Sequence, residues 1–505
     1  MTDRPDRPGR SRGDIVAVID IGSNSGRVMV FEREASSHLR LLAGSRASLR
    51  LVHDVDTRGA LSDATMARAT EALRDFQAIA NGAGAGRIVA VATAAMRDAA
   101  NGPLFAERLY RELGIRIEII GGLAEAHYGF AGAVRGLAVS NGLLFDLGGG
   151  SLQITRFTNR RLGKGVSLPF GALRVSERFL ESDPPTAKQI RRLRDHVRRH
   201  LEKAHVARLA PGDRLVGTGG TLRNLAKIDG RIRRYPIGGL HGYELSVDRL
   251  QEVIDRLAAT KEKRRDDVHG LSAERADSIV GGAVAIQALA EFVHAKHILV
   301  SGQGVREGIA LKLLRIPVGS PETVKEASLA SLVSRFDGWK REAASRRRGV
   351  ASALHRALEP RAPAGVATAI DDAARVLDIG KTLNVVNRHE HAADILLSTD
   401  LNGFAHHELA LVSSIVRRAG DRHADVISLG PVGDTAVPGP VDRAAVILAL
   451  ADEIEARCPH GARIAVECKV GRSVTLSIPL LKSWLVKDLD KRFERAFGRS
   501  LIVRT

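Results

Sequence analysis

One pattern occurs twice in this chain and limits the folds that it can adopt. In "AVIDIGSNSGRVMVFE" (17–32) an apolar run ends at Asp20, and a Gly/Ser/Asn turn and a second apolar run follow. "LLFDLGGGSLQITRF" (143–157) repeats this order, with Asp146 followed by three glycines and a serine. Each copy predicts a strand, a tight turn and a second strand. The repetition therefore predicts a duplicated α/β unit with a cleft between its two halves.

The rest of the chain predicts several domains, since 505 residues are too many for a single hydrophobic core. Strands are expected at 16–20, 26–32, 88–93 and 116–120, in alternation with helical stretches. The stretch 62–80 is an amphipathic helix whose cap is Ser62 or Asp63. The uncharged run 279–290 is too short to cross a bilayer and predicts a buried helix.

The character of the chain changes after about residue 316. The pattern from 321 to about 425 is helical and basic, and 429–443 is expected to be a loop or linker. A small α+β unit is predicted to follow, with a helix at 444–456, strands in "ARIAVECKV" and "SVTLSIP", and a last helix from Lys482.

Composition indicates a soluble globular protein with an anionic partner. The chain is 44% hydrophobic and 27% charged, and its formal net charge is +18. Aromatic residues make up only 4%, which disfavours base-stacking surfaces and hence nucleic acid. The basic segment 188–214 is best interpreted as a solvated helix face. With two cysteines and a polar N-terminus, we expect a cytoplasmic protein without a membrane anchor.

Glycine-rich turns after predicted strands favour phosphate as the recognised group. Besides the two turns above, "RLVGTGGTLRNLAKI" and "HILVSGQGVREGIALKLL" place bare backbone amides and a helix start after a strand. A carboxylate beside such a turn repels phosphate unless a cation lies between them, so Asp20 and Asp146 imply Mg²⁺. Capping of turn amides is the alternative role of these aspartates. The chain has no P-loop motif.

Seven motifs occur in an order that resembles one known family. They are "AVIDIGSNS", "VATAAMRDA", "IIGGLAEA", "FDLGGGS", "SLPFGALR", "GTGGTLRNL" and "GVREG". Over residues 14–315 the chain resembles the exopolyphosphatase/guanosine pentaphosphate phosphohydrolase family of the acetate-kinase, sugar-kinase, heat-shock-protein and actin superfamily. "NRHEHAADILLSTDLNGF" is similar to the extra helical domain of the family's long members.

The resemblance implies α/β architecture with two actin-like (ribonuclease H-like) domains and a cleft between them. An all-α HD-like domain and a small α+β domain would follow. The implied divisions are a disordered basic tail at 1–13, actin-like domains at 14–134 and 135–315, the helical domain at 316–430, and the C-terminal domain at 431–505.

The resemblance also implies site residues where this chain matches the motifs. Glu125 matches the glutamate that activates the attacking water, and Asp146, with Asp20, is the implied metal corner. The implied phosphate-binding residues are Gly22, Ser23, Asn24, Ser25, Arg97, Gly148, Gly149, Gly150, Ser151, Gly219, Gly220, Thr221 and Arg306.

The sequence departs from the family pattern near both predicted sites. Ala124 replaces the first glutamate of a usual pair, and Gln153 stands where the second loop commonly carries glutamate. An uncharged amide should hold a divalent cation less well, which predicts weaker Mg²⁺ affinity or slow turnover. In the helical domain, Leu377 takes the place of a metal-binding histidine and leaves Asp378 alone.

A histidine cluster in the helical domain is a weaker candidate for metal binding. No acidic ligands occur at a recognisable spacing within it, so we expect this domain to be structural or regulatory. The histidines concerned are His389, His391, His406 and His407.

These observations favour a Mg²⁺-dependent exopolyphosphatase that removes terminal phosphate from inorganic polyphosphate. Guanosine pentaphosphate is the alternative substrate, for which Phe170 or Tyr243 would stack the base. A non-catalytic polyphosphate or alarmone sensor, a kinase and a nucleic-acid-binding protein are further alternatives. A monovalent cation activator and a homodimer are expectations from the resemblance.

Overall fold

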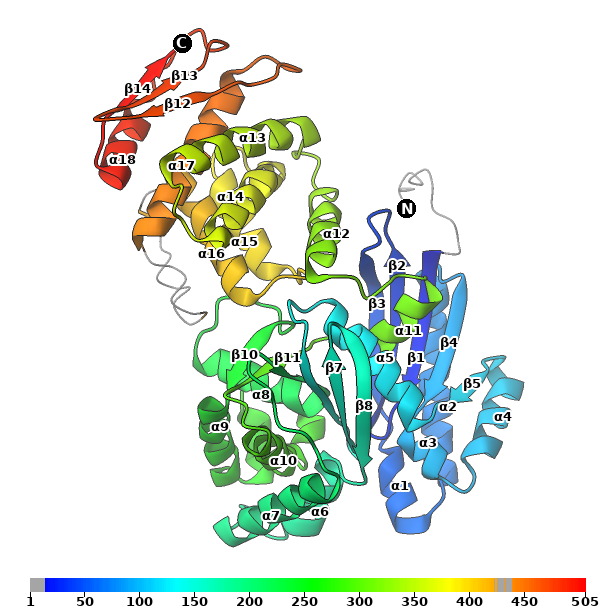
Figure 1. Ribbon diagram of the computed structural model, residues 1–505. Coiled ribbons are helices and arrows are strands. Elements are labelled where there is room, and N and C mark those ends of the chain that lie inside the picture. The colour runs from blue at the N-terminus through cyan, green and yellow to red at the C-terminus, as the bar shows by residue number, and fades with distance from the viewer. Residues whose placement is uncertain (1–13, 422, 425–431, 433–437) are drawn as a thin grey trace. The chain divides into compact units, whose positions relative to one another are not determined.

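The computed structural model describes residues 14–421, 423–424, 432 and 438–505 (Figure 1). These divide into two compact units. Unit 1 takes the described residues of Met1–Ile232 and Leu240–Ala327, and unit 2 takes those of Arg233–Gly239 and Ser328–Thr505. The expected tail at 1–13, with its four arginines, lies outside the described residues. The expected domain limits at 134/135, 315/316 and 430/431 stay predictions.

The first sheet of unit 1 has five strands in the order β3-β2-β1-β4-β5. β1 pairs antiparallel with β2 and parallel with β4. The strands are β1 (Ile15–Ile21), β2 (Ser25–Arg33), β3 (Leu39–Ser48), β4 (Arg87–Ala92) and β5 (Ile117–Ile119). The four predicted strands are confirmed. β3 was not predicted, because it is an edge strand whose residues are all partly or fully exposed and lack a clear apolar face.

The second sheet repeats the first one and adds a strand. Its order is β10-β11-β9-β6-β7-β8, with β6 antiparallel to β7 and parallel to β9. The strands are β6 (Gly142–Leu147), β7 (Leu152–Thr158), β8 (Arg161–Leu168), β9 (Arg214–Thr218), β10 (Tyr243–Ser246) and β11 (His297–Val300). β6 and β7 correspond to β1 and β2, so the predicted duplication is confirmed.

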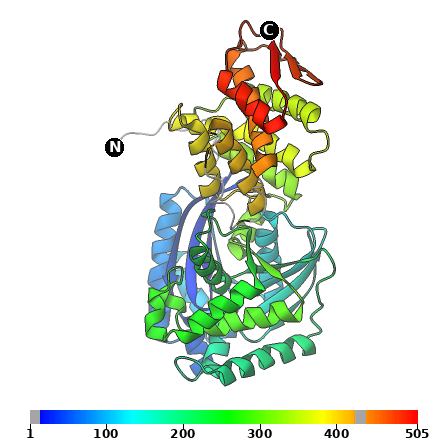
Figure 2. The ribbon, with the colours of Figure 1, turned by 90° about the vertical axis from the view of Figure 1, so that its left-hand side faces the viewer.

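Helices pack on both sheets, and those of the second half lie together in Figure 2 (green). Ser62 caps α2, where its side chain accepts a hydrogen bond from the Thr65 amide, as predicted. Every residue from Ile279 to Ala290 is buried in α10, which confirms the predicted buried helix. The α-helices of unit 1 are α1 (Leu51–Arg58), α2 (Asp63–Gly82), α3 (Ala94–Asp98), α4 (Gly102–Leu113), α5 (Gly122–Arg135), α6 (Ala172–Phe179), α7 (Ala187–Lys203), α8 (Gly220–Ile232), α9 (Val247–Ala259), α10 (Ile279–Phe292) and α11 (Val305–Leu313), with 3₁₀ turns η2 (Glu262–Asp267) and η3 (Ala273–Arg275).

Each half contributes one helix that packs on the sheet of the other half. Residues Val16 and Val18 of β1 pack with Ile309 of α11, which follows the second sheet in sequence. Conversely, Phe130 of α5, which follows the first sheet, packs with Phe157 of β7. The opposite face of β1 packs against α2 and α4. Because side chains alternate along a strand, β1 can be buried on both faces in this way.

α5 and α11 also cross each other at backbone contact distance. A Cβ on Gly308 would overlap the carbonyl oxygen of Tyr128, and a Cβ on Gly132 would overlap that of Gly304. Only glycine permits such an approach. The crossing joins the two halves of unit 1 through their helices.

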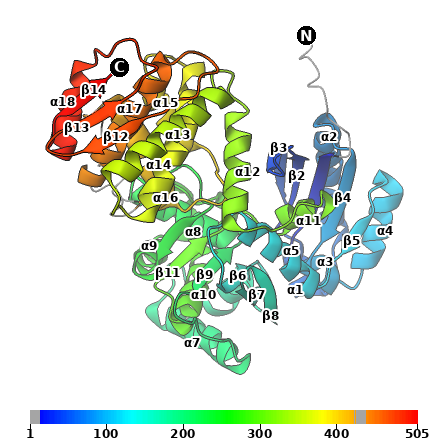
Figure 3. The same cartoon turned by 45° about the horizontal axis from the view of Figure 1, so that its top comes forward.

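Unit 2 is helical and ends in a three-stranded sheet, seen with α18 in Figure 3. The predicted helical character of 321–425 is confirmed for the described residues. The elements are α12 (Pro321–Val333), which contains the boundary between the units, α13 (Arg341–Leu358), α14 (Ala364–Val376), η4 (Leu377–Thr382), α15 (Arg388–Ser398), α16 (His406–Gly420), α17 (Pro438–Arg457), β12 (Glu467–Val470), β13 (Val474–Ser477), α18 (Lys487–Phe497) and β14 (Leu501–Arg504).

Two predictions for the end of the chain need correction, and one strand was missed. Residues 438–443, expected in a loop, belong to α17, whose first residue is Pro438, because proline suits a helix start. The last helix begins at Lys487 rather than Lys482, and β14 after it was not predicted. Of the rest of the expected loop or linker, residues 429–431 and 433–437 lie outside the described residues. Residue 432 is described.

Two further features of the chain bear on membrane association and on disulfide bonds. In the described part of the chain, no helix is both long enough and apolar enough to span a membrane. Cys458 and Cys468 are both free thiols.

The α5–α11 crossing predicts a sharp difference between two glycine substitutions. Gly308→Ala should lower the free energy of unfolding by at least about 1–3 kcal/mol, because the new methyl group overlaps the Tyr128 backbone. Gly82→Ala, at the end of α2 with no atom within 4 Å of the added Cβ, should change it by less than about 1 kcal/mol. Chemical denaturation of both variants measures this, and equal stabilities would contradict the close crossing.

Candidate active site

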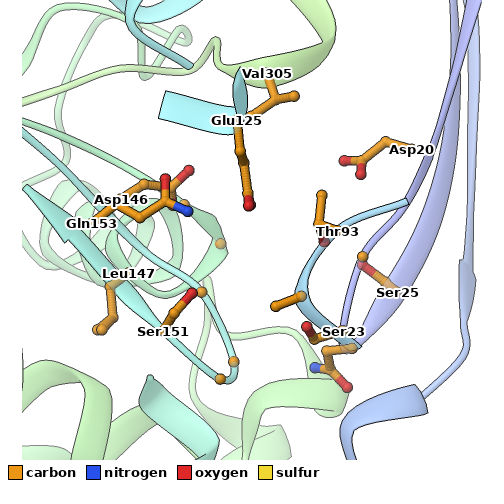
Figure 4. Close-up of a pocket in the computed structure, with 18 of the residues that line it drawn as sticks. Asp20, Ser23, Ser25, Thr93, Glu125, Asp146, Leu147, Ser151, Gln153 and Val305 are labelled. Carbon is orange, nitrogen blue, oxygen red and sulfur yellow. The ribbon is translucent and has the colours of Figure 1, made fainter. Parts of the chain in front are cut away.

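Unit 1 contains a partly open cavity of about 140 Å³ beyond the ends of its central strands (Figure 4). Residues that directly follow β1, β4, β6 and β9 meet there with the first turns of α5 and α11. The cavity is lined by Asp20, Gly22, Ser23, Asn24, Ser25, Arg27, Thr93, Ala94, Glu125, Asp146, Leu147, Gly148, Gly149, Gly150, Ser151, Gln153, Gly219, Gly220, Arg223, Arg275, Val305 and Arg306.

The two glycine turns have the same hydrogen-bond pattern. The Gly22 amide donates to the Ser25 carbonyl at 3.2 Å, and the Gly148 amide donates to the Ser151 carbonyl at 3.0 Å. The second turn is also held by α6, since the Ala172 amide donates to the Gly148 carbonyl at 2.9 Å. These fixed turns present backbone and hydroxyl groups to the cavity, which suits an anion.

The two aspartates occupy equivalent strand positions but have different partners across the hairpin. Asp20 lies opposite Arg27 in the β1–β2 register, whereas Asp146 lies opposite Gln153 in the β6–β7 register. Burial raises the pKa of both carboxyls. The charges of Arg306 and Arg27 oppose that rise at Asp20. Asp146 thus has an uncharged neighbour where Asp20 has a guanidinium.

Glu125 lies in the first turn of α5, and its side chain points into the cavity between Asp146 and Asp20 (Figure 4). Burial raises the pKa of Glu125 to about 7, and the charges of Asp146 and Asp20 act in the same direction. A hydrogen bond from Gln153 and the charge of Arg97 act against this rise. Glu125 Oε2 has no hydrogen-bond partner among the described residues. A carboxylate with this pKa can accept a proton near neutral pH.

Four arginines balance the three carboxylates of the cavity. Burial is the main cause that lowers the pKa of Arg27 to about 9 and of Arg223 and Arg275 to about 10. Mutual repulsion adds to this effect, since Arg306 lowers the pKa of both Arg27 and Arg223. All three remain protonated at neutral pH.

Two nitrogen atoms of Arg306 lack hydrogen-bond partners, unlike the bonded groups of Arg223 and Arg275. The residue is 6% exposed, and its Nε and Nη1 atoms have no hydrogen-bond partner within the described residues. By contrast, Arg223 Nη1 donates to the Gly302 carbonyl at 2.9 Å, and Arg275 Nη1 donates to Thr221 Oγ1 at 3.3 Å. A buried guanidinium with unpaired N–H groups costs free energy unless a ligand accepts them.

The structure brings together most of the residues that the sequence predicted for the site. Two do not line the cavity. Arg97 donates to the Ile120 carbonyl at 3.1 Å, and its Nη1 lies 3.9 Å from Glu125 Oε2, so it contacts the site from behind. Thr221 is buried and serves as the acceptor for Arg275.

Sequence reasoning missed Thr93 and three arginines of the cavity. Arg223 lies inside one of the motifs that carried the resemblance, and Arg27, two residues after another, could have been found from the hairpin register opposite Asp20. Arg275 comes from the short 3₁₀ turn η3, for which the sequence offered no periodic signal.

The expectation that Phe170 or Tyr243 might stack a base is not supported. Phe170 is 3% exposed and packs against His196 and His200. Tyr243 is 1% exposed and donates its hydroxyl to Asp229 at 2.6 Å. Both rings are used in packing, so neither has a free face for a nucleotide.

In unit 2, Asp378, which lacks the neighbouring metal-binding histidine of the family pattern, is surrounded by cations. Asp378 pairs with Arg347 at 2.7 Å, Lys381 at 2.9 Å and Arg388 at 3.0 Å. Burial acts to raise the pKa of Asp378, but the charges and hydrogen bonds of Arg347 and Lys381 outweigh it and lower that pKa. Arg347, fully buried, also donates to Asp452 at 2.8 Å. Guanidinium groups therefore neutralise this buried carboxylate pair.

The histidines of unit 2 do not form a cluster with acidic ligands. Among the described residues, no three His, Cys, Asp or Glu side chains are placed so that they could hold a metal ion. His389 lies 3.9 Å from Asp452, and burial lowers the pKa of His389 to about 4. His406 bonds to the Tyr235 hydroxyl at 2.8 Å.

The unpaired N–H groups of Arg306 predict that its substitution affects phosphate binding more than stability. Arg306→Gln should weaken the binding of inorganic phosphate about tenfold or more, because charge-assisted hydrogen bonds are lost. It should destabilise the protein less than Arg223→Gln, which breaks the bond to Gly302. Calorimetric titration and chemical denaturation measure the two effects. Unchanged phosphate affinity in Arg306→Gln would contradict this role.

Comparison with known proteins places unit 1 in a family. The chain matches the model of the Ppx/GppA phosphatase family over residues 29–316, more than half of its length. It is 28% identical to exopolyphosphatase 1 of Mycobacterium leprae over 66% of this chain and 98% of that protein. It is 31% identical to exopolyphosphatase 2 of Mycobacterium tuberculosis over 59% of this chain and 98% of that protein.

A solved structure extends the likeness to the fold. The exopolyphosphatase from Cytophaga hutchinsonii is 25% identical, with a TM-score of 0.56 over 61% of this chain and all of that chain. The predicted actin-like duplication is thereby confirmed. Since the family match ends at residue 316, nearly all of unit 2 is additional to the matched region. The chain belongs to the Ppx/GppA phosphatase family, and is a long form within it.

Proposed function

We propose that this chain is an exopolyphosphatase, which hydrolyses the terminal phosphoanhydride bond of inorganic polyphosphate. The observation that carries the proposal is Glu125, whose buried carboxylate has a pKa raised to about 7 and lines a cavity with four arginines and two glycine turns. The names of the family relatives agree with this reaction. The net charge of +18 further favours a long polyanion.

In the proposed reaction Glu125 is the general base. Its carboxylate accepts a proton as the oxygen of a water molecule forms a bond to the terminal phosphorus. The bridging P–O bond of the chain breaks, which releases orthophosphate and leaves a chain shortened by one phosphate. Arg97 lies behind Glu125 and favours its ionised form, so that it is ready to accept the proton.

The remaining groups of the cavity stabilise and align the phosphate. Arg306 supplies unpaired N–H donors, while Arg27 and Arg223 supply positive charge. The turns at Gly22–Ser25 and Gly148–Ser151 offer donors without bulky side chains. Phosphoryl transfer depends mainly on such positioning and charge stabilisation, so these groups suit it.

The carboxylates fit a magnesium ion. Asp20 and Asp146 are hard oxygen donors, and each raises the pKa of Glu125 by repulsion, which a divalent cation would relieve. Mg²⁺ usually keeps several waters and needs only one or two carboxylates besides phosphate oxygens. Bound at Asp146 and Asp20, it would neutralise phosphate oxygens. A monovalent activator and a homodimer stay predictions.

One observation favours a second function, that of a weakly active sensor of polyphosphate. Gln153 lies opposite Asp146, where a glutamate would add charge for the metal. Guanosine pentaphosphate stays the alternative substrate, although the two aromatic residues considered for its base are buried in packing.

Substitution of the proposed base tests the reaction. Glu125→Gln should reduce phosphate release from long-chain polyphosphate by about 10²-fold or more, the usual contribution of general base catalysis. Glu118→Gln, which removes an exposed carboxylate on β5, is the matched control and should keep full activity. Parallel assays with guanosine pentaphosphate identify the preferred substrate. Full activity in Glu125→Gln would contradict the proposal.

The pKa of Glu125 predicts the pH dependence of the reaction. Because the base must be ionised, kcat/KM should fall as the pH drops through about 7 and should level off above it. A pH profile measured in the free-enzyme regime reports this titration. A flat profile between pH 6 and about 8 would exclude Glu125 as the rate-determining base.

The amide at Gln153 predicts a change in metal use. Gln153→Glu should lower the Mg²⁺ concentration for half-maximal activity about tenfold, because a second carboxylate then faces Asp146. Gln153→Met, of similar size but without an oxygen donor, should raise it. A Mg²⁺ titration of phosphate release measures both. If the wild-type protein and both variants need the same Mg²⁺ concentration for half-maximal activity, Gln153 has no role in metal binding.

A further inference from the structure

α6 lies directly behind the second glycine turn and binds three of its carbonyl groups. The first two amides of α6 donate to the carbonyls of Gly148 and Gly149, at 2.9 and 3.1 Å. The third carbonyl, that of Gly150, accepts a hydrogen bond from Arg174 Nη1 at 3.1 Å. Two of the three bonds thus come from the backbone of α6, and the third comes from a side chain.

These bonds determine which way the amides of the turn point. In a trans peptide, the N–H points opposite to the carbonyl of the preceding residue. All four residues of the turn (148–151) line the cavity, whereas the described lining includes no residue of α6. Because the three carbonyls point to α6, the amides of residues 149–151 point to the other side, where the cavity lies. A row of amides with this orientation suits an anion.

The peptide group after Gly150 is the least constrained of the three. A Cβ on Gly171, which precedes α6, would overlap the backbone of the first two residues of the turn, so α6 fits closely on them. A Cβ on Gly150 would come no closer than 3.6 Å to another atom, so the third residue has room to rotate. Such a rotation would place the Gly150 carbonyl at the cavity in place of the Ser151 amide. The hydrogen bond from Arg174 opposes it.

The first glycine turn is held without a side chain. The Asn24 carbonyl occupies the position that the Gly150 carbonyl has in the second turn. It accepts hydrogen bonds from the backbone amides of Leu49 and Arg50, at 3.0 and 2.9 Å, just before α1. Among these two equivalent carbonyls, only that of Gly150 depends on the side chain of another residue, Arg174.

The guanidinium of Arg174 is itself held by a carboxylate from the other half of unit 1. Arg174 Nε donates to Asp56 Oδ2 at 3.0 Å, and Nη2 donates to Oδ1 at 2.6 Å, which is the paired geometry of arginine and carboxylate. Asp56 belongs to α1, which follows the first sheet, whereas α6 follows β8 of the second sheet. The hydrogen bond to Asp56 is the main cause that raises the pKa of Arg174. Asp56 thus occupies two of the three guanidinium nitrogens and leaves Nη1 to Gly150.

We propose that Arg174 is a positioning residue that turns the Ser151 amide toward the phosphate, and that Asp56 of the opposite half holds Arg174 in place for this role. The described lining of the cavity includes neither Arg174 nor Asp56, so both act through the turn and not on the substrate. This inference rests on the proposed function and deepens it, since it makes one phosphate-binding group depend on a contact between the two halves.

Replacement of the guanidinium tests the role of Arg174. Arg174→Gln should weaken the binding of inorganic phosphate about tenfold, because the Ser151 amide is then no longer fixed. Arg174→Lys keeps the charge but lacks the planar fork that binds Asp56 and Gly150 together, so it should weaken binding nearly as much. Calorimetric titration measures the affinity, and chemical denaturation confirms that each variant is folded under the conditions used.

A matched control lies on the same helix. Arg178 is exposed on α6 and outside the described lining of the cavity, so Arg178→Gln should leave phosphate affinity unchanged. Phosphate affinity equal to that of the wild-type protein in Arg174→Gln would overturn the proposal. Wild-type affinity in Arg174→Lys would overturn it as well, because charge alone would then be sufficient.

A double-mutant cycle tests whether Asp56 acts through Arg174. Asp56→Asn should weaken phosphate binding about threefold in the wild-type background and should have no further effect in Arg174→Gln. This non-additivity is not expected if the ion pair only stabilises the fold, since lost stability does not change the affinity of the folded protein. Independent, additive losses of affinity would overturn the link between the two halves.

Equilibrium binding of inorganic phosphate also separates this inference from the proposed reaction. If the wild-type protein binds phosphate but releases none from polyphosphate, the proposed reaction is wrong, and the cycle still decides the role of Arg174. If the wild-type protein releases phosphate and Arg174→Gln keeps full affinity, the reaction stands and the positioning role is wrong. A wild-type protein that does not bind phosphate would overturn the positioning role as well.

Discussion

The backbone contact between α5 and α11 is the interaction on which the rest of unit 1 depends. Each helix packs on the sheet of the opposite half, and glycines at 132 and 308 let the two helices touch. The first turn of α5 carries Glu125, and the first turn of α11 carries Arg306. A single crossing therefore sets the separation of the Glu125 carboxylate and the Arg306 guanidinium, which come from different halves of a duplicated chain.

Within the cavity, the pKa of each ionisable group depends on the charges of its neighbours. Removal from water would neutralise the carboxylates or the guanidinium groups if either set were present by itself. Together they keep one another charged: Arg306 and Arg27 oppose the rise in the pKa of Asp20, and Asp146 opposes the fall in the pKa of Arg223. The pKa of Glu125 is raised to about 7, because burial and the repulsion of two aspartates outweigh the hydrogen bond from Gln153 and the charge of Arg97.

Local patterns were sufficient to predict the duplicated hairpins and their glycine turns, because each depends on a few consecutive residues, and the family resemblance pointed to Glu125, which lines the cavity. The cavity arginines were harder to predict. Arg27 required the register of β2 against β1, and Arg275 required the path of a 3₁₀ turn that has no sequence periodicity. Tertiary packing also covers the rings of Phe170 and Tyr243, so neither can stack a nucleotide base as expected. In unit 2, Lys381 is three residues from Asp378, but Arg347 and Arg388 come from α13 and α15 and could not be inferred from the motif around Asp378.

Arg223, Lys227 and Arg231 form a row of cations on one face of α8, which has a consequence for the proposed substrate. An inorganic phosphate chain has two identical ends and no head or tail, so any sense of direction must come from the protein. Here the row leads from exposed Arg231 to half-buried Arg223 and stops at a wall that carries Glu125 and Asp146. The carboxylates repel a further phosphate in the absence of a cation, and the chain can advance no further. On the proposed function, the order of charges along one helix would define which phosphate is the last.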